Sequence, residues 1–402
     1  MNCDDTDYEV LASQIESLLK RPDGALQIRD EKTRRRLVEG ARKLAESLEF
    51  PRETYRRIQY SHLVLPLAVV GVDTGVFSAL ASENRPFCST ELAKKTGVDT
   101  QLLRRLLRYY QATDMISQVA VDTYQSSPVA NVLSSDNHSD SLRFTHKITA
   151  QGSSNLPDWL RSIQYSCPVG VSPTAWTSSI PSELDPFTYL KHNPWALKLF
   201  QSHMMAQRVG RKSLMDAFDF KKHLNTQDIS SSTFLFVDIG GGTGSQSLAF
   251  RKQYSKLPGR VALQDRPEVV ERVKPMFANI ENIEAEVYDF STTPQPIRGA
   301  RVYYMRNIFH AWADAKCVEI LLNIKAGMTE QSVLMIDEIA IPETNAKGQA
   351  AQHDLEVMIC VGGVERTEGQ WASLLSGVGL IVHEIVKYDE DYEDALIIAG
   401  LA

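Results

Sequence analysis

The sequence predicts an α/β protein, with a doubly wound C-terminal domain behind a mainly helical N-terminal region that contains a winged helix. After the polar run Asn225 to Ser232, short apolar segments alternate with amphipathic ones, which is the pattern of a parallel sheet with crossover helices. From Tyr8 to Glu49, apolar residues recur at helical spacing. A helix–turn–helix pattern followed by a short hairpin begins at Cys88.

The 402 residues exceed the usual size of one compact domain, so we expect several structural units. We assign residues 1–135 to a helical and winged-helix dimerisation region, 136–229 to linking helices that roof a substrate pocket, and 230–402 to a catalytic domain. The apolar stretch from Leu63 to Leu80 is interrupted by Pro66 and Asp73, which makes it too polar for a membrane span. We therefore expect a buried helix pair there, and a homodimer that covers the remaining apolar surface.

The composition, 43% hydrophobic and 23% charged, is ordinary for a globular protein. A net charge of -7 lacks the basic surplus that nucleic-acid binding requires, so we expect no nucleic-acid partner and no membrane partner. The five cysteines form no C-x-x-C pair, which argues against a disulfide framework and a structural zinc site. The acidic start, MNCDDTDYEV, does not resemble a secretory signal, so we expect a cytoplasmic protein.

The segment CSTELAKKTGVDTQLLRRLLRYYQATDMI contains two predicted helices. Ser89 can cap the first, Gly97 ends it, and Asp99 starts the second. The hairpin near Val119 to Tyr124 would complete a winged helix. Two alternatives follow: a packing and dimerisation module, which we favour, or DNA binding through basic side chains. The basic candidates are Lys94, Lys95, Arg104, Arg105 and Arg108.

The strongest motif is TFLFVDIGGGTGSQSLAFRKQY, which reads as a strand, a glycine-rich turn and an amphipathic helix. The strand ends at Asp238, and Gly240, Gly242 and Gly244 would let a ligand approach the backbone at the carboxyl edge of a parallel sheet. The next strand, RVALQD, ends in Asp265, where a carboxylate can hold a ribose diol. A dinucleotide site is the competing interpretation, but the loop lacks the G-x-G-x-x-G spacing.

Further motifs follow in order: LQDRPEVV, YDFSTTPQP, YYMRNIFHAWADAKCVEIL, EIAIPE and GGVERTEGQW. With VDIGGGTG, they resemble the small-molecule O-methyltransferase family, and its fungal secondary-metabolism branch in particular. The resemblance implies a Rossmann-like domain that binds S-adenosylmethionine (SAM), and a winged-helix dimerisation region. The SAM-binding positions that it implies are Asp238, Gly240, Gly242, Gly244, Asp265, Arg266, Asp289, Phe290 and Arg306.

By resemblance, a histidine removes the proton from a phenol or enol while glutamates orient it, and the oxygen then takes the methyl group. His310 matches the histidine, and Glu338 and Glu365 match the glutamates. An imidazole suits this role because its pKa lies near neutrality and a neighbouring carboxylate raises its basicity. The alternatives are that His310 is a packed helix histidine and that Glu365 only pairs with Arg366 or Lys387.

One departure favours a different reaction, because the family's His-Asp-Trp is His310-Ala311-Trp312 here. The branch also contains SAM-dependent pericyclases of the leporin type, which dehydrate an alcohol to a quinone methide and steer a cyclisation without moving the methyl group. We narrowly favour this second reaction. The residues that match its pattern are His146, Phe200, Arg208 and Arg306. We expect Arg306 one helical turn before His310, and Asn307 stands where an acid is expected.

Asp354 and Met358 are expected to line the substrate pocket. His353, Asp354 and Glu356 lie on one predicted helix, and we interpret them as pocket wall or solvated face with no metal site. The expected substrate is a small aromatic compound of the polyketide or pyridone type. A non-catalytic DNA-binding or SAM-binding regulator is a third hypothesis, which the acidic composition disfavours.

Overall fold

The computed structural model describes residues 5–19, 28–83, 85–170, 172–182, 184–207, 209–212, 214–222, 228–389 and 391–402. Its backbone contacts divide into two compact units, Met1–Leu67 and Ala68–Ala402. This division falls much earlier than residues 135 and 229, so the predicted three-region organisation stays a prediction.

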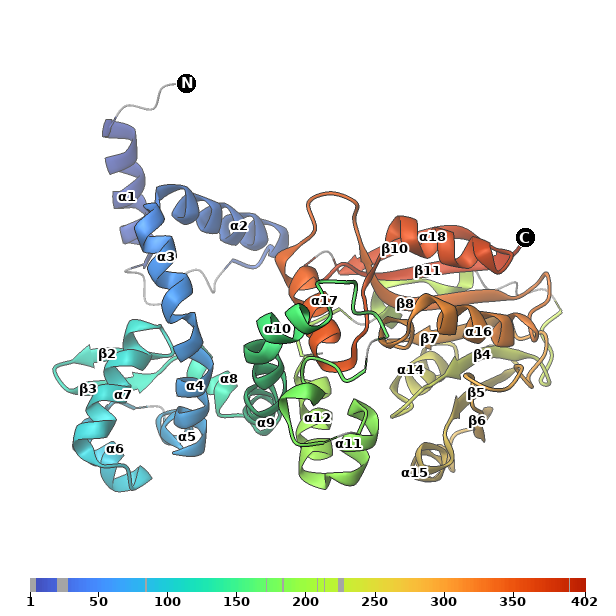
Figure 1. Ribbon diagram of the computed structural model, residues 1–402, viewed down its shortest axis with the longest axis horizontal. Coiled ribbons are helices and arrows are strands. Elements are labelled where there is room, and N and C mark those ends of the chain that lie inside the picture. The colour runs from blue at the N-terminus through green and yellow to red at the C-terminus, as the bar shows by residue number, and fades with distance from the viewer. Residues whose placement is uncertain are drawn as a thin grey trace. The chain divides into compact units, whose positions relative to one another are not determined.

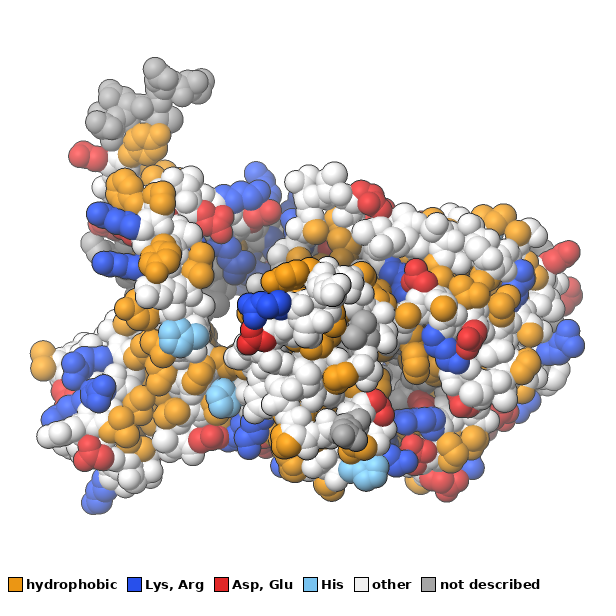
Figure 2. All heavy atoms as spheres, in the orientation of Figure 1, with side chains coloured by type: hydrophobic (Ala, Val, Ile, Leu, Met, Phe, Trp, Pro, Cys, Tyr) orange, Lys and Arg blue, Asp and Glu red, His pale blue; other side chains and the backbone are white. Residues whose placement is uncertain are grey.

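The N-terminal unit is helical, as its apolar periodicity predicts. Its elements are α1 (Asp5–Leu19), α2 (Glu31–Leu48), α3 (Pro51–Tyr60) and the 3-10 turn η2 (Ser61–Leu63). Asp30 caps α2 by accepting a hydrogen bond from the Thr33 backbone amide at 3.1 Å. Neither α2 nor α3 buries a side chain, and Figure 2 shows hydrophobic side chains exposed along α3. The exposed apolar residues of the unit include Tyr8, Leu18, Leu19, Leu37, Leu48, Phe50, Tyr55, Ile58, Tyr60 and Val64.

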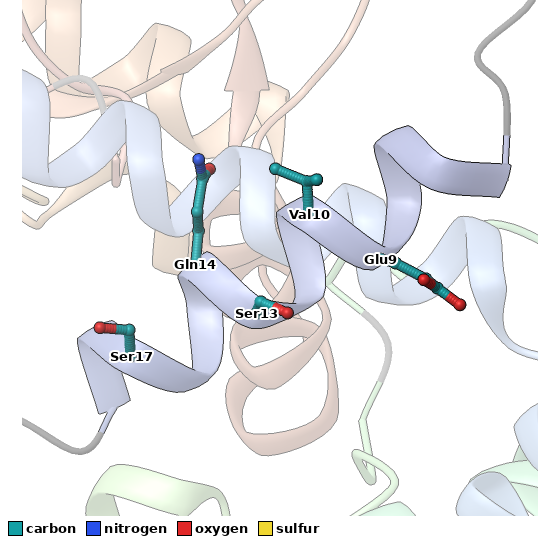
Figure 3. Close-up of a pocket in the computed structure, with 5 residues that line it drawn as sticks. All are labelled: Glu9, Val10, Ser13, Gln14 and Ser17. Carbon is teal, nitrogen blue, oxygen red and sulfur yellow. The ribbon is translucent and has the colours of Figure 1, made fainter.

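A surface hollow of about 400 Å³ lies along α1. Figure 3 shows that its lining comes from one side of this single helix, and the lining residues are Glu9, Val10, Ser13, Gln14 and Ser17. One helix face cannot enclose a small molecule, and the hollow brings together no pair of acid and base. It is therefore not the reactive site.

The apolar stretch after Leu63 forms α4 (Val64–Asp73) and α5 (Val76–Ser82), as predicted. Val72, Val76, Phe77 and Leu80 are buried. Among the described helices, none is by itself long and apolar enough to cross a membrane. One bent pair, Pro51–Asp73 with Val76–Ser82, meets the length and composition criteria at an angle of 59°.

The elements of the predicted winged helix are present in order. They are β1 (Phe87–Cys88), α6 (Ser89–Thr96), α7 (Thr100–Ala112), β2 (Ile116–Ala120), β3 (Thr123–Ser126) and α8 (Pro128–Leu133), and the strands pair as β1-β3-β2. Lys95 is ion-paired with Glu83, and Arg104 Nη2 lies 3.4 Å from Asp122 Oδ2. Two of the basic side chains on which the DNA-binding alternative depends are thus neutralised by neighbouring acids.

The linking helices pack around one helix of the catalytic domain, α17 (Gly348–Val361). Gly152 permits the close approach, because a Cβ at this position would lie 2.6 Å from Ile359 of α17. The segment that follows is tied to α17 by the backbone hydrogen bond from Trp176 to Ile359, at 3.1 Å. The linking elements are α9 (Asp136–Phe144), the π-helix η3 (Thr145–Thr149), α10 (Ala150–Ser162), η4 (Thr177–Ser179), α11 (Pro186–His192) and α12 (Pro194–Ala206).

The catalytic domain is built on a mixed sheet with the order β10-β11-β8-β7-β4-β5-β6, and β9 pairs with β8 (Figure 1). The strands from β8 to β6 run parallel, while β11 pairs antiparallel with both β8 and β10. The strands are β4 (Phe234–Ile239), β5 (Arg260–Asp265), β6 (Ile283–Val287), β7 (Val302–Arg306), β8 (Val333–Ile341), β9 (Arg366–Thr367), β10 (Leu380–Asp389) and β11 (Asp394–Leu401). The chain order reverses between β4 and β7, which is where doubly wound sheets bind ligands.

Both faces of the sheet are buried, as expected for strands that read as continuous apolar runs. Side chains alternate between the faces. Tyr303 belongs to the core formed with α16 and α18, whereas Tyr304 belongs to the core formed with α13, α14 and α15. The helices are α13 (Leu214–Ala217), η5 (Phe220–Lys222), α14 (Ser245–Gln253), α15 (Pro267–Phe277), the 3-10 turn η6 (Phe309–Ala311), α16 (Asp314–Lys325) and α18 (Glu368–Gly377). The sequence prediction of an α/β domain is confirmed.

Candidate active site

The glycine-rich turn lies directly after β4, at the reversal point of the sheet. Gly240 and Gly242 have φ angles of 70° and 56°, in the left-handed region that favours glycine. A Cβ at Gly240 would lie 2.7 Å from Ile308, whereas the nearest atom to a Cβ at Gly242 is a carbonyl oxygen 4.0 Å away. The backbone at Gly242 therefore borders open space that a ligand can enter.

Two carboxylates hold the turn in place. Asp238, which is buried, accepts hydrogen bonds from the Ser247 backbone amide at 3.2 Å and hydroxyl at 2.7 Å. Burial raises the pKa of Asp238 to about 6. Asp265, at the end of β5, accepts a hydrogen bond from the Gly242 amide at 2.9 Å. Asp238 thus ties the glycine-rich turn to the start of α14, and Asp265 binds the part of the turn that borders open space.

Three other predicted cofactor residues lie around this loop in different settings. Phe290 is half-buried and is 3.6 Å from the Cβ position of Gly240, so it borders the loop. The Asp289 carboxylate is exposed and accepts a hydrogen bond from the Ser291 hydroxyl at 2.6 Å, which lowers its pKa. Arg266 is exposed and pairs with Glu268 at 3.6 Å.

Strand β8 carries two neighbouring acids that face opposite sides of the sheet. Asp337 Oδ2 lies 3.3 Å from Arg306 Nε, and Tyr388 donates a hydrogen bond to Asp337 Oδ1 at 2.6 Å. Glu338 Oε1 instead accepts hydrogen bonds from the backbone amides of Ile308 at 2.6 Å and Phe309 at 2.8 Å. Asp337 therefore fixes Arg306, and Glu338 fixes the turn that carries His310.

His310 is brought together with both predicted glutamates. Its Nδ1 atom lies 3.2 Å from Glu338 Oε2 and 3.0 Å from Glu365 Oε1. Both carboxylates are buried, and the His310 side chain is 18% exposed. Because Nδ1 faces two carboxylates, it carries a proton, and the other ring nitrogen, Nε2, is left for a reacting group.

The two carboxylates outweigh burial in setting the proton affinity of His310. Burial alone would lower its pKa, but the negative charges of Glu338 and Glu365 hold the pKa well above the usual value. The same pairing lowers the pKa of Glu365 to about 2. Among the described residues, the Oε2 atoms of Glu338 and Glu365 have no hydrogen-bond partner, and Glu338 Oε2 is the atom that faces His310 Nδ1.

Glu365 is anchored by α17 and not by the basic residues near it in sequence. The Asp354 carboxylate accepts a hydrogen bond from the Glu365 amide at 2.8 Å, and His353 Nδ1 lies 3.0 Å from Glu365 Oε1. Arg366 instead binds Asp314, and Lys387 binds Glu368. The alternative in which Glu365 only pairs with Arg366 or Lys387 is therefore wrong. The solvated-face interpretation of His353 and Asp354 is also wrong, because both contact Glu365.

Arg306 is the last residue of β7, and His310 lies in a 3-10 turn, so they are not one turn apart on a common helix as expected. Tyr304 also donates a hydrogen bond to Asp337, so Arg306 packs in a buried cluster with Asp337, Tyr304 and Tyr388. The Asp337 charge helps to hold the pKa of Arg306 above its ordinary value. Because Asp337 holds the Arg306 guanidinium in one position, Arg306 can polarise a ligand only from that position.

The remaining predicted pocket residues occupy different places. His146 is half-buried in η3, which packs against α17. The ring of Phe200 lies 5.7 Å from that of Phe144, and Met358 packs against the core around Trp159. Asn307 is exposed, with a φ angle of 52°. Arg208 lies outside the described residues.

Two contacts of the site escaped the sequence analysis. Asp337 was overlooked as the anchor of Arg306, although strand alternation next to Glu338 places it on the opposite face. The contact of His353 with Glu365 has no sequence signal, because it joins a helix to the loop that follows it. The candidate ligand atoms of His310, Glu338 and Glu365 lie within 4.8 Å of one another. We assign no metal there, because the Nδ1 atom that faces both carboxylates carries a proton.

The chain is similar to known O-methyltransferases. Residues 177–381 match the model of the O-methyltransferase domain. The chain is 33% identical to O-methyltransferase ucdC of Aspergillus ustus, over 91% of this chain and 94% of that protein. It is also 33% identical to demethylsterigmatocystin 6-O-methyltransferase of Aspergillus parasiticus, over 85% of this chain and 86% of that protein.

Among solved structures, LepI in complex with SAM is 29% identical and has a TM-score of 0.87, over 98% of this chain and 100% of that chain. A structure described as a pericyclic reaction enzyme has the same identity, TM-score and coverage. The open backbone at Gly242 and the carboxylate of Asp265 suit a nucleoside ligand. The cofactor is SAM. The chain is an enzyme of the O-methyltransferase family, and it has the fold of the members that act in fungal secondary metabolism.

Proposed function

We propose that this enzyme transfers the methyl group of SAM to a phenolic or enolic hydroxyl of a small aromatic metabolite. The observation that carries the proposal is the contact of His310 Nδ1 with two buried carboxylates, Glu338 and Glu365. Arg306, on which the cyclisation hypothesis relies, is instead paired with Asp337. The assembled site therefore supports proton removal from a hydroxyl better than it supports cyclisation, the reaction that the sequence narrowly favoured.

His310 would accept the hydroxyl proton on Nε2, while Glu338 and Glu365 stabilise the imidazolium that forms. Phenols have a pKa of about 10, so a histidine whose pKa is raised takes such a proton more completely than an ordinary histidine. The enzyme must still begin with a neutral imidazole. We therefore expect the rate to rise with pH until His310 is mostly neutral.

SAM would supply an electrophilic methyl group on its sulfonium. Transfer of this group to the substrate oxygen would give a methyl ether, with S-adenosylhomocysteine as the leaving group. In this chain, Asp265 would hold the ribose diol, Asp289 and Phe290 would border the adenine, and the Gly240–Gly244 turn would approach the nucleoside. The Arg306 and Asp337 pair would lie beside the glycine turn and contribute fixed charge.

The proposed substrate is an aromatic polyketide or pyridone with an acidic ring hydroxyl. One relative is named for 6-O-methylation of demethylsterigmatocystin, which supports this class. The test is to incubate candidate phenols with methyl-labelled SAM and to follow both products by mass spectrometry. We expect one labelled methyl per S-adenosylhomocysteine, and we expect His310→Asn to abolish transfer while SAM binding, measured by calorimetry, persists.

SAM-dependent dehydration and pericyclic cyclisation is the second candidate. The likeness to LepI and to a pericyclic reaction enzyme favours it, as does Ala311 in place of the family's acid. A protonated His310 could give its proton to a leaving hydroxyl, which departs as water. A product lighter by one water, formed with SAM unconsumed from a pyridone alcohol, would establish this activity and exclude methyl transfer as the reaction of that substrate.

We also propose that the chain forms a homodimer through its N-terminal helices. Helices in proteins gain most of their stability when an apolar face packs against a neighbour. Neither α2 nor α3 has a buried side chain, so their apolar residues remain available for such packing. A second copy presents the same apolar surface, so a twofold contact would bury both.

A further inference from the structure

Glu365 is shared by two histidines. His310 Nδ1 and His353 Nδ1 each lie 3.0 Å from the same oxygen, Glu365 Oε1. The two ring centroids are 6.0 Å apart, and His353 is 21% exposed. A carboxylate oxygen that accepts from two imidazoles cannot give its full charge to either one.

The charge balance of the site points in the same direction. Glu338 and Glu365 are 2% and 3% exposed, and two buried carboxylates opposite one imidazolium leave a net negative charge. Arg366, the cation next to Glu365 in the sequence, is already bound to Asp314 at 2.7 Å. His353 is therefore the second group in contact with Glu365 that can balance its charge.

We propose that His353 is a positioning residue that controls, through Glu365, how readily His310 takes up and releases its proton. The inference rests on the proposed function, because it concerns the same acid–base site. A hydrogen bond or a positive charge from His353 stabilises the Glu365 carboxylate and weakens its hold on the His310 proton. His353 thereby keeps the neutral form of His310 within reach near neutral pH.

Several other titratable groups border His353 or the helix that carries it. Asp354 and Glu356 are on the same helix, and His203 Nε2 lies 3.9 Å from Glu356 Oε1. The elements packed against α17 add His146 from η3 and Glu338 from β8. A charge on His353 would lower the pKa of His203, Asp354 and Glu365, so these groups must be followed alongside His310 in any titration.

The test is a titration of ¹³Cε1-labelled histidine by NMR on the full chain with SAM bound and no substrate. His353→Leu removes the donor and the charge, His353→Gln keeps an N–H donor without a charge, and His383→Gln is a matched control at an exposed histidine on β10. The resonance of His310 is assigned from its loss in His310→Asn.

We expect His353→Leu to raise the titration midpoint of His310 by about 0.5 to about 2 pH units, as Coulomb's law gives for charges about 6 Å apart at intermediate to aqueous dielectric constants. His353→Gln should show a smaller rise, and His383→Gln none. The ascending limb of the pH profile of kcat/KM should move in the same direction.

An unmoved His310 midpoint in His353→Leu would overturn the proposal, even if the variant unfolds at a lower temperature, because stability loss alone indicates a structural role. The NMR titration requires no turnover. A shifted midpoint without methyl transfer to any phenol would therefore sink the proposed function and leave the coupling between the two histidines established.

Discussion

At the residue scale, the loss of the acid beside the histidine does not deprive His310 of a carboxylate. Ala311 stands at that position, yet Glu338 and Glu365 both contact Nδ1, at 3.2 Å and 3.0 Å. These carboxylates come from β8 and from the loop before β9. Backbone amides hold the Glu338 carboxylate, and Asp354 holds the backbone amide of Glu365. The proton affinity of His310 is thus raised by carboxylates from distant segments, and it does not depend on an acid at position 311.

Glu365→Gln should shift the pH dependence of catalysis toward acid. The negative charge of Glu365 helps to raise the pKa of His310, so its removal lowers that pKa, and the ascending limb of kcat/KM moves to lower pH. A weaker base also removes the proton less completely, so we expect the plateau to fall roughly 100-fold. A pH–rate profile measures both effects.

The matched control is Glu368→Gln, which removes a half-buried carboxylate that pairs with Lys387 and does not contact His310. Its profile should coincide with that of the parent enzyme. A limb that moves to higher pH in Glu365→Gln would contradict the electrostatic account of His310.

The resemblance of short motifs identified His310, Glu338 and Glu365, since the spacing of residues in each motif is local. Asp337 and His353 could not be recognised in this way, because their partners Arg306 and Glu365 become neighbours only when separate segments pack together. Arg306 was expected on a helix beside His310, but the strand continues to this residue. Motif matching thus gives the reacting groups, and tertiary contacts give the groups that hold them.

At the element scale, the turn after α17 is packed against the catalytic segment. Val364 donates a backbone hydrogen bond to the His310 carbonyl at 2.8 Å, and a Cβ on Gly363 would overlap that same carbonyl oxygen. The turn can follow this path only with glycine at position 363. α17, the turn and η6 therefore form one support for His310.

Gly363→Ala should displace His310 from its carboxylates. We expect a loss of stability of about 1 to 3 kcal/mol from overpacking, and a fall in kcat that exceeds the change in KM. Thermal unfolding and steady-state kinetics measure the two effects. Gly377→Ala is the control, since open space surrounds that position in α18, and it should leave activity unchanged.

Asp337→Asn tests the opposite face of β8. Asp337 is 2% exposed and compensates the charge of Arg306, so the neutral amide would leave a buried guanidinium without its counter-charge. We expect unfolding in denaturant to show a loss of about 3 kcal/mol or more. A loss below about 0.5 kcal/mol would mean that solvent, and not Asp337, compensates Arg306.

At the scale of the whole molecule, the exposed apolar side chains of the N-terminal unit predict self-association. Tyr55 and Ile58 on α3 are 64% and 66% exposed. Replacing both with Glu should convert a dimer to a monomer in light scattering, because burying two carboxylates in an apolar contact is unfavourable. Lys43→Glu, at an exposed position on α2, should leave the mass unchanged. A parent protein that is monomeric at every concentration would refute the homodimer.

The sequence predicted the large-scale layout well where periodicity is strong. The alternation of apolar strands and helices after Ser232 predicted the parallel sheet, and the apolar run after Leu63 predicted α4 and α5. The position of Leu67 as the limit of a compact unit had no sequence signal, because α4 continues through it from Val64 to Asp73. A boundary inside a continuous helix depends on which side chains contact residues far away in the sequence. The local sequence pattern does not reveal those contacts.

The two acids of β8 also bear on how this strand finds its register. The sequence VLMIDEIAI is apolar on both faces, so a slip by one residue would still present a hydrophobic surface and one acid to each side. Asp337 and Glu338 differ by a single methylene group. The Glu338 carboxylate reaches the amides of Ile308 and Phe309, and the Asp337 carboxylate accepts hydrogen bonds from the hydroxyls of Tyr304 and Tyr388. These two sets of hydrogen bonds are specific to one register of β8, and exchanging the two acids would disrupt them without altering the net charge.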